Sequence, residues 1–363
     1  MRKQNLPVTL PLILLVLSGC QTNSKPTAKG YDPASITPQI PFIQQQPLVF
    51  RETVRPGDRI LFVGDELTQQ MFYTRAVAAA LIAMMPEADL RFFNGGKEGA
   101  TAASAKDWID DLLVLTRPTL VFVCVGLNDV TDSGPVDKMM ADYKYSLADL
   151  IDRIKPSVER LVVISTPAVD SGEVDFASDT PVNGRLRQLA EAAKSVAEDL
   201  DVGFVDVFVP MRRVYIAAAR LTANHPVGFE RLTINGRLPN EQGHVVLAST
   251  VLYGIGVLSA DLDPVGWSPV IPQKMRLIRG ALGLALTPPS LDAAQRSRAL
   301  YQSMISFDER FFRIWRLAPR GQATRSPHQV AEVESAWIQV SQASAAYEAR
   351  SKVIDQRSEV RSQ

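Results

Sequence analysis

The sequence has no excess of charge of either sign, because 39 Lys and Arg residues match 39 Asp and Glu residues in a chain of 363. Proteins that bind nucleic acid carry clusters of basic side chains, so we expect no nucleic-acid partner. Histidine is also scarce, with only His225, His244 and His328. No cluster of His and Cys supports a metal site, and we expect neither a metal nor a cofactor.

Cysteine occurs only twice, at Cys20 and Cys124. We expect no disulfide, because Cys20 lies in a predicted processing signal and leaves Cys124 without a partner. The second cysteine lies in the apolar run 120–125. A lone cysteine in such a run is typical of a small core side chain.

No apolar run near the start is long enough to span a bilayer. The first nineteen residues have a basic beginning and a short apolar run at 10–17. This combination predicts that residues 1–19 are a signal peptide. The motif that ends it resembles the bacterial lipobox, in which the signal is cut before a cysteine that then receives lipid. That motif is Leu17-Ser18-Gly19-Cys20.

We therefore expect a mature protein that is held to a membrane by lipid on Cys20. Two or three acyl chains anchor a protein firmly where one chain does not. Residues 20–50 mix Pro, Gln, Thr, Ser and Lys without periodicity, which predicts a flexible tether. The predicted location is the cell envelope. The outer membrane is preferred over the inner, because Gln21 stands where Asp would favour inner-membrane retention.

Between residues 51 and 262, short apolar runs alternate with helical patterns, and hydrophobic residues make up 46 % of the chain. Continuous apolar strands separated by helices predict an α/β fold with a doubly wound parallel sheet, a flavodoxin-like three-layer sandwich. The expected strands are 59–63, 89–93, 120–125, 161–165 and 203–207. The expected helices are 66–85, 103–115, 136–154, 183–200 and one from about 245.

Polar and glycine-rich stretches follow the first three expected strands. In a parallel α/β sheet the functional site forms outside the carboxyl ends of the strands. We therefore expect three stretches that are far apart in sequence to converge in space. They are Gly64-Asp65-Glu66, Asn94-Gly95-Gly96 and Gly126-Leu127-Asn128-Asp129.

The alternation of apolar runs and helical patterns ends after residue 262, where several prolines interrupt it. Residues 263–363 predict a mostly helical C-terminal extension, with an amphipathic run at 329–354. We expect its aromatic side chains to pack on the main domain rather than to bind a ligand. They are Tyr301, Phe307, Phe311, Phe312 and Trp315.

Four blocks, in this order along the chain, resemble the SGNH (GDSL-type) hydrolase superfamily. That family carries Gly-Asp-Ser after its first strand, a loop of the Asn-x-Gly-x-x-Gly type after the second, Gly-x-Asn-Asp after the third, and Asp-x-x-His near the domain end. The resemblance spans about residues 57–257. The matching blocks are Gly64-Asp65-Glu66, Asn94-Gly95-Gly96-Lys97-Glu98-Gly99, Gly126-Leu127-Asn128-Asp129 and Asn235-Gly236-Arg237-Leu238.

The resemblance implies ester hydrolysis by a Ser–His–Asp triad, with an oxyanion hole made by a Gly N–H, an Asn side chain and the Ser N–H. Position by position, the Ser is Glu66, the Asp is Asn235 and the His is Leu238, whereas Gly99 and Asn128 keep the oxyanion-hole positions. Without a hydroxyl nucleophile or an imidazole base at these positions, we do not expect serine-esterase activity.

None of the three histidines is expected to replace the missing base. His244 begins a helix and is expected to pack in the core, His225 is expected in a surface loop, and His328 is expected to be exposed. Thr68 lies one helical step from position 66 and should point in another direction.

Glu66 begins a helix, where free N–H groups and the helix dipole favour a negative charge. We therefore expect its carboxylate to lie in or beside the hole, bonded to Gly99 and Asn128. The alternative uses Glu66 as a general base or nucleophile with Asp65 or Glu98 as the acid partner. Of these two, Asp65 is expected to fix its loop as an acceptor and Glu98 to be a surface charge.

A metal site built from Asp65, Glu66 and Asp129 is not expected, because no His or Cys supports it. The sequence thus predicts a lipid-anchored envelope protein that acts as a binding or scaffold module. Its predicted partners are membrane lipid at Cys20 and an envelope glycan or acylated ligand. Two alternatives stay open: a hydrolase with a site rebuilt around Glu66, and a structural module whose C-terminal extension binds a protein.

Overall fold

The sheet is parallel and has five strands. The structure is a computed structural model and describes residues 48, 50–85, 87–173, 175, 179–224, 232–257, 291–316, 327–338 and 340–343. The strand order is β2-β1-β3-β4-β5, and every neighbouring pair is parallel. The strands are β1 (Arg59–Gly64), β2 (Arg91–Gly96), β3 (Leu120–Cys124), β4 (Arg160–Ile164) and β5 (Gly203–Val205).

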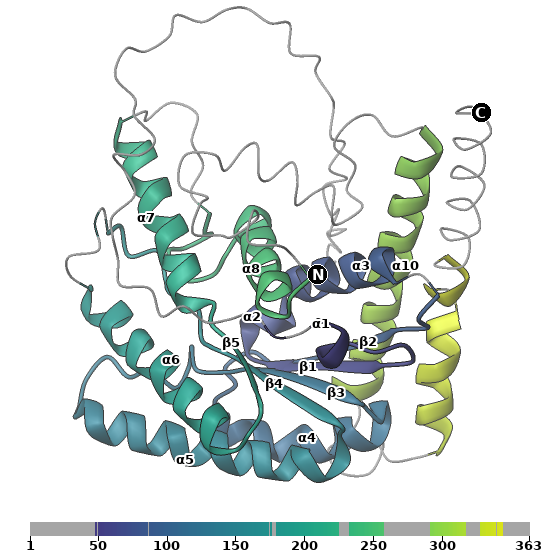
Figure 1. The fold of residues 1–363 in the computed structure, drawn as a ribbon, viewed down its shortest axis with the longest axis horizontal. Helices are drawn as coiled ribbons and strands as arrows, with labels where there is room; N and C mark the ends of the chain where they lie inside the picture. Colours follow the sequence, from purple (N-terminus) through teal and green to yellow (C-terminus); the bar gives the residue numbers. More distant parts are fainter. Residues whose placement is uncertain are drawn as a thin grey trace, which may run out of the picture.

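Helices cover both faces of the sheet (Figure 1). Every residue of β3 is buried, including the free thiol Cys124, as expected for a strand between two helical layers. This confirms the predicted α/β, doubly wound fold. One layer holds α4 (Ala102–Thr116), α5 (Val136–Ile154) and α6 (Pro181–Asp199). The other holds α3 (Phe72–Met84), α7 (Phe208–Asn224) and α8 (Glu241–Gly254).

The single helix expected at 66–85 is wrong. The segment forms two helices, α2 (Glu66–Gln69) and α3, separated by Met71 in the left-handed region at φ 65°. The reason is a contact from another strand. The Asn94 side chain donates to the carbonyl oxygen of Thr68 at 2.7 Å, and the Met71 N–H donates to the same oxygen at 3.0 Å. This carbonyl is therefore taken up where a continuous helix would receive the N–H of Phe72.

Strand β2 continues three residues beyond the expected end at residue 93, through Gly95 and Gly96. A Cβ atom on Gly96 would lie 2.3 Å from the backbone nitrogen of Gln69, so only glycine lets α2 rest against the end of this strand. Helix α8 begins at Glu241, about four residues earlier than expected, with the Asn240 side chain as its N-cap. Helix α7 was not anticipated.

The C-terminal extension packs along the edge strand β2 (Figure 1). Helix α10 (Leu291–Arg316) places Phe307 and Phe311 against Phe93, with ring centroids 6.0 and 5.6 Å apart. The expectation that these aromatics serve packing is confirmed for both. The side chain of Tyr301 and the predicted boundary at 262/263 lie outside the described residues. So do the signal peptide, Cys20 and most of the tether.

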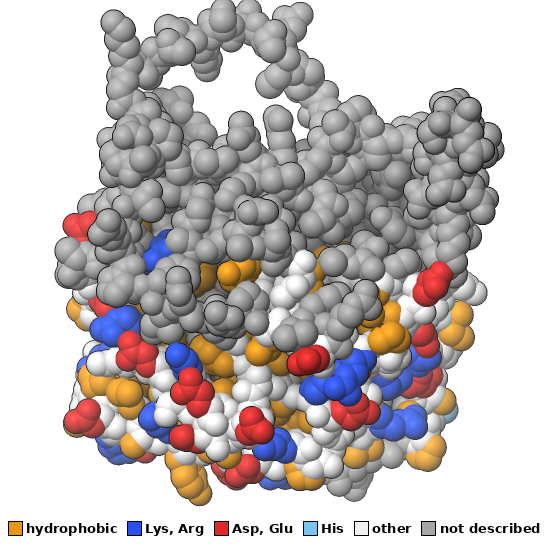
Figure 2. Space-filling model, in the orientation of Figure 1, with side chains coloured by type: hydrophobic (Ala, Val, Ile, Leu, Met, Phe, Trp, Pro, Cys, Tyr) orange, Lys and Arg blue, Asp and Glu red, His pale blue; other side chains and the backbone are white. Residues whose placement is uncertain are grey.

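Charged side chains of both signs are interspersed on the described part of the surface shown in Figure 2. Several of them form ion pairs, for example Arg153 with Asp110 and Lys138 with Asp142. In the part of the chain that the structure describes, we find no helix with the length and apolar character needed to cross a membrane.

Candidate functional site

The turns after β1, β2 and β3 meet at the carboxyl end of the sheet, as expected. Their meeting point is the carboxylate of Glu66, the first residue of α2. Its Oε2 atom accepts from the backbone N–H of Gly99 at 3.1 Å and from the Asn128 side-chain amide at 2.6 Å. The expected contact with both donors is therefore present, and the Glu66 side chain is 15 % exposed.

Two carboxyl groups, the buried one of Asp65 and the partly buried one of Asp129, shape the turns beneath this contact. The side chain of Asp65 is the N-cap of α2 and accepts from the backbone N–H of Leu67 at 3.0 Å, which is the loop-fixing role expected for it. Asp129 accepts from the backbone N–H of Ala102 at the start of α4. Both carboxyls hold the backbone so that the side chain at position 66 and the donors around it converge.

Burial perturbs both of these carboxyls. It raises the pKa of Asp65 to about 8, with the negative charge of Glu66 as the next largest cause. Burial likewise raises the pKa of Asp129 to about 6, against the opposing effect of the Ala102 hydrogen bond. At neutral pH Asp65 therefore holds a proton, but its side chain is closed off from solvent by the fold.

The fourth block of the resemblance, residues 235–238, also contacts Glu66. It does so through a residue for which the sequence predicted no role. Arg237 lies 3.6 Å from Glu66, measured from Nη2 to Oε1. The same Nη2 donates to Asn128 Oδ1 at 2.8 Å and to the carbonyl oxygen of Leu127 at 3.0 Å. Arg237 stands at a variable position of the family pattern. The one feature of the sequence that could have pointed to it is its positive charge, in a block that was expected to lie near Glu66.

Asn235 and Leu238 are brought to the edge of the site, but neither touches Glu66. The side-chain oxygen of Asn235 accepts from the backbone N–H groups of Arg237 and Leu238 at 3.1 and 3.0 Å. It therefore shapes the turn that presents Arg237. Leu238 is partly buried and packs against the hydrophobic core. Neither side chain at these two positions can take a proton from a nucleophile.

Of the two histidines that the structure describes, neither is placed to act as a base. His244 is buried among Phe72 and Tyr73, and its Nε2 is 2.5 Å from Gln70 Oε1. Burial lowers its pKa to about 3, so it stays neutral, and its expected packing role is confirmed. His328 is exposed, as expected. His225 lies outside the described residues.

The remaining candidates for chemistry are separated from Glu66 or turned away from it. The hydroxyl of Thr68 is buried and 2.9 Å from that of Tyr73. Glu98 is exposed, as expected for a surface charge, and its backbone N–H donates to the Gln69 side chain. Within the described ranges, no group of three or more His, Cys, Asp or Glu residues has the arrangement of a metal site.

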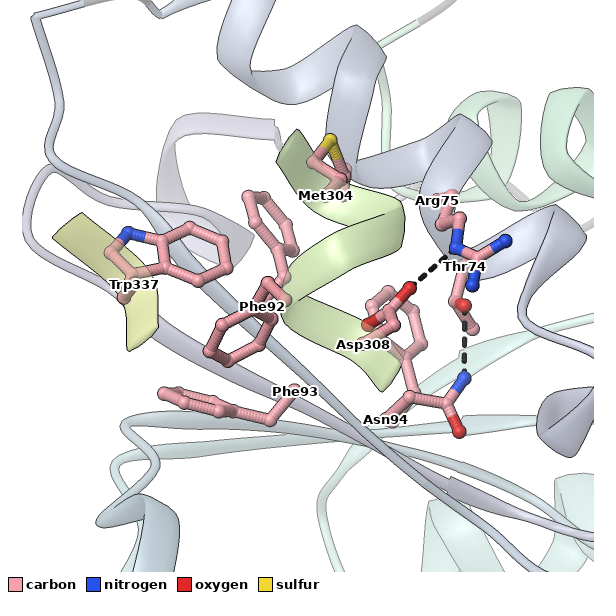
Figure 3. A pocket seen from close by; sticks show the side chains of 11 residues that line it. Thr74, Arg75, Phe92, Phe93, Asn94, Met304, Asp308 and Trp337 are labelled. Carbon is pink, nitrogen blue, oxygen red and sulfur yellow. Dashed lines mark hydrogen bonds and ion pairs between the residues drawn. The ribbon is translucent and has the colours of Figure 1, made fainter. Parts of the chain in front are cut away.

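A separate small cavity lies between β2, α3 and the C-terminal extension (Figure 3). Figure 3 shows Phe92, Phe93 and Trp337 beside it, with Asp308 bonded to Arg75 and Asn94 to Thr74. Its volume is about 10 Å³, roughly the space of one water molecule. It contains none of the residues around Glu66 and is a packing defect rather than a ligand pocket.

Comparisons with known proteins match the same part of the chain. A model of the GDSL-like lipase/acylhydrolase family matches residues 62–244. The acetylxylan esterase of Geobacillus stearothermophilus is 24 % identical over 221 residues, which cover 55 % of this chain and 94 % of that protein.

Solved structures are also similar to part of the chain. An acetylxylan esterase from Geobacillus stearothermophilus is 22 % identical with a TM-score of 0.45, and the match covers 56 % of this chain and 96 % of that one. A gut microbial diltiazem-metabolizing enzyme is 24 % identical with a TM-score of 0.47, over 56 % of this chain and 48 % of that enzyme.

Proposed function

Since the chain belongs to the GDSL-like lipase/acylhydrolase family, we propose that it is a member that binds a ligand without cleaving it by serine-esterase chemistry. The observation that carries the proposal is the position of the Glu66 carboxylate. It occupies the two donors, Gly99 N–H and Asn128 Nδ2, that the family's oxyanion would need. Fold alone does not decide activity, whereas the chemistry of the site does.

Ester hydrolysis of the family's kind needs a nucleophile, a base and free oxyanion donors. Glu66 stands in place of the hydroxyl, and Leu238 in place of the imidazole. The donors that remain already hold a negative charge, which would repel a second one forming beside it. Loss of nucleophile and base together removes on the order of 10⁶ in turnover in a well-studied triad.

A rebuilt hydrolase centred on Glu66 would need an acid partner that faces the same ligand. Asp65 holds a proton, but its side chain is buried and bonded to the backbone of its own helix. Glu98 is exposed, and no contact joins its carboxylate to Glu66 among the described residues. This arrangement supports the binding role over the hydrolytic one.

We propose further that lipid on Cys20 holds the protein to the envelope, with the outer membrane preferred, and that residues 20–50 serve as the tether. An envelope glycan or an acylated molecule is the proposed ligand, in keeping with the name of the acetylxylan esterase to which the chain is similar. The C-terminal extension is the proposed surface for a protein partner.

Turnover of short acyl esters and acetylated xylo-oligosaccharides by the mature protein tests the proposal. We expect none above background, and no acyl adduct by mass spectrometry. The triple variant Glu66→Ser, Asn235→Asp, Leu238→His is the positive control. It restores all three groups of the triad, so it should show turnover. Turnover by the native protein that Glu66→Gln abolishes would overturn the proposal in favour of a rebuilt hydrolase.

A further inference from the structure

The class of ligand follows from the groups that surround the Glu66 carboxylate. Resting on the proposed binding function, we propose that the groups around Glu66 form a carboxylate-binding site, and that Glu66 occupies it until a carboxylate of the ligand takes its place. The bound group is therefore an anionic one, an acidic sugar or a peptide C-terminus, and not the neutral ester of a hydrolase substrate.

Two hydrogen-bond donors and one positive charge, from three parts of the chain, surround the carboxylate. Gly99 contributes a backbone N–H, Asn128 an amide, and Arg237 a guanidinium 3.6 Å away. Hydrogen bonds in which one or both partners are charged are about twice as strong as neutral ones. A carboxylate therefore gains more from this set than an ester carbonyl of the same shape.

The donors are held in place by contacts that do not involve Glu66. The Asn128 amide nitrogen also donates to the carbonyl oxygen of Ala100 at 3.2 Å, and its oxygen accepts from Arg237. Arg237 in turn donates to the Leu127 carbonyl. The turn that carries Arg237 is fixed by the backbone N–H of Asp170, which donates to the Gly236 carbonyl at 2.7 Å. The site is thus preorganised for an incoming anion.

The side chain of Glu66 can move away from the donors without a change in the fold. It is the first residue of a helix of four residues, and its side chain reaches the surface. Only its Oε2 atom is hydrogen-bonded among the described residues, whereas its Oε1 atom is 3.6 Å from Arg237. A tethered group competes at an effective concentration in the millimolar range, so a free carboxylate should bind the native protein weakly.

Calorimetric titration with acetate, at constant ionic strength, tests the proposal on the full mature protein. Glu66→Ala empties the donors, so acetate should bind this variant at least about tenfold more tightly than the native protein. Acetamide, the neutral analogue, should bind neither. Adding Arg237→Ala to Glu66→Ala should weaken acetate at least about tenfold. Glu98→Ala is the matched control, because it removes a glutamate beside Gly99 that contacts none of the donors, and it should leave acetate binding at the native level.

Thermal unfolding of each variant, measured first, establishes that the donors are compared in folded proteins. Glu66→Gln provides a second comparison. Its amide oxygen can still accept from Gly99 and Asn128, so in this variant the donors stay occupied. Acetate should therefore bind this variant far more weakly than it binds Glu66→Ala. Equal acetate affinity of the native protein and Glu66→Ala, or equal binding of acetate and acetamide, would overturn the proposal.

The same titrations distinguish the two sources of carboxylate. Glucuronate is compared with glucose, and acetyl-Ala-Ala with its C-terminal amide, on Glu66→Ala. Preference for the acid over its neutral partner in either pair supports the site and names the source. If neither acid binds better than its neutral partner, the carboxylate-site proposal is overturned. The result of the ester assays does not depend on this outcome. The proposed lack of serine-esterase activity therefore stands or falls separately from the carboxylate site.

Discussion

Two regions of the molecule each bring an arginine to a carboxyl group, and they do so in different surroundings. At the contact between α3 and α10, Arg75 Nε lies 2.5 Å from Asp308, and the side chains are 13 % and 11 % exposed (Figure 3). At the carboxyl end of the sheet, Arg237 lies 3.6 Å from Glu66, and the two side chains are 46 % and 15 % exposed. Both partners of the first pair are enclosed, whereas the arginine of the second is open to solvent.

The difference indicates which contact serves the fold and which one is free to exchange. A buried ion pair strongly destabilises the protein when one partner is removed, because the other charge is left without compensation. An arginine that is about half exposed contributes little to stability, because solvent screens its charge. We therefore expect the extension interface to respond to substitution in unfolding experiments and the groups around Glu66 to respond in binding experiments.

The largest expected effect is on the aromatic contact of the extension. Phe307 is buried against Phe93 and Trp337, so Phe307→Ala should lower the free energy of unfolding by about 4 kcal/mol. Urea denaturation measures this. Phe312, five residues further along α10 and only partly buried, gives the matched variant Phe312→Ala, which should cost less than half as much. Equal losses would show that the described interface does not carry the stability.

The buried ion pair comes next. Arg75→Ala should lower the free energy of unfolding by about 3 kcal/mol, because it leaves Asp308 buried without its partner. Burial raises the pKa of Asp308 to about 6, and Arg75 opposes that rise. Without Arg75 the lone carboxyl should bind a proton more readily than in the native protein, so the loss should become smaller as the pH falls. Arg153→Ala, which breaks the exposed pair with Asp110, is the control and should cost under about 1 kcal/mol.

The buried carboxyls beneath Glu66 predict how stability changes with pH. The pKa values of Asp65 and Asp129 are raised from 3.8 to about 8 and about 6. The folded state therefore keeps protons that the unfolded chain has lost above pH 4. The contribution of these groups is complete below pH 4 and is lost as the pH rises through the raised values, by at most about 1.4 kcal/mol per pH unit for each group.

Asp129→Asn isolates one part of this dependence, because the amide oxygen can still accept from the Ala102 N–H. Urea denaturation of the native protein should show about 2 kcal/mol of stability lost to Asp129 between pH 4 and pH 6, and the variant should lack that portion. An identical pH dependence in the two proteins would contradict the raised pKa of Asp129.

The smallest expected effect on stability belongs to the open pair. Arg237→Ala should change the free energy of unfolding by less than about 1 kcal/mol, because its guanidinium is half exposed. Thermal unfolding at matched protein concentration measures this. A loss as large as that of Arg75→Ala would mean that the turn at 233–238 is a structural element, and the comparison between the two regions would fail.

Much of this architecture could be predicted from the sequence, because it depends on local patterns. The apolar strands predicted the parallel sheet, and the polar turns that end them predicted that Glu66, Gly99 and Asn128 converge. The break between α2 and α3 could not be predicted, because it depends on Asn94, which lies 26 residues away from Thr68 in the chain. Arg237 was missed for the same reason, since its partner Asn128 lies 109 residues away.

The cover over β2 also sets an order of events during synthesis. Strand β2 forms the edge of the sheet, and the residues that pack on it, among them Phe307 and Trp337, lie more than two hundred positions later in the chain. The residues of the sheet are made long before those of this cover, so Phe92 and Phe93 lack these packing partners, and the outer edge of β2 stays open, until the extension is present. Chains that stop short of residue 291 should therefore join to one another through this strand, and holding chaperones should bind there first.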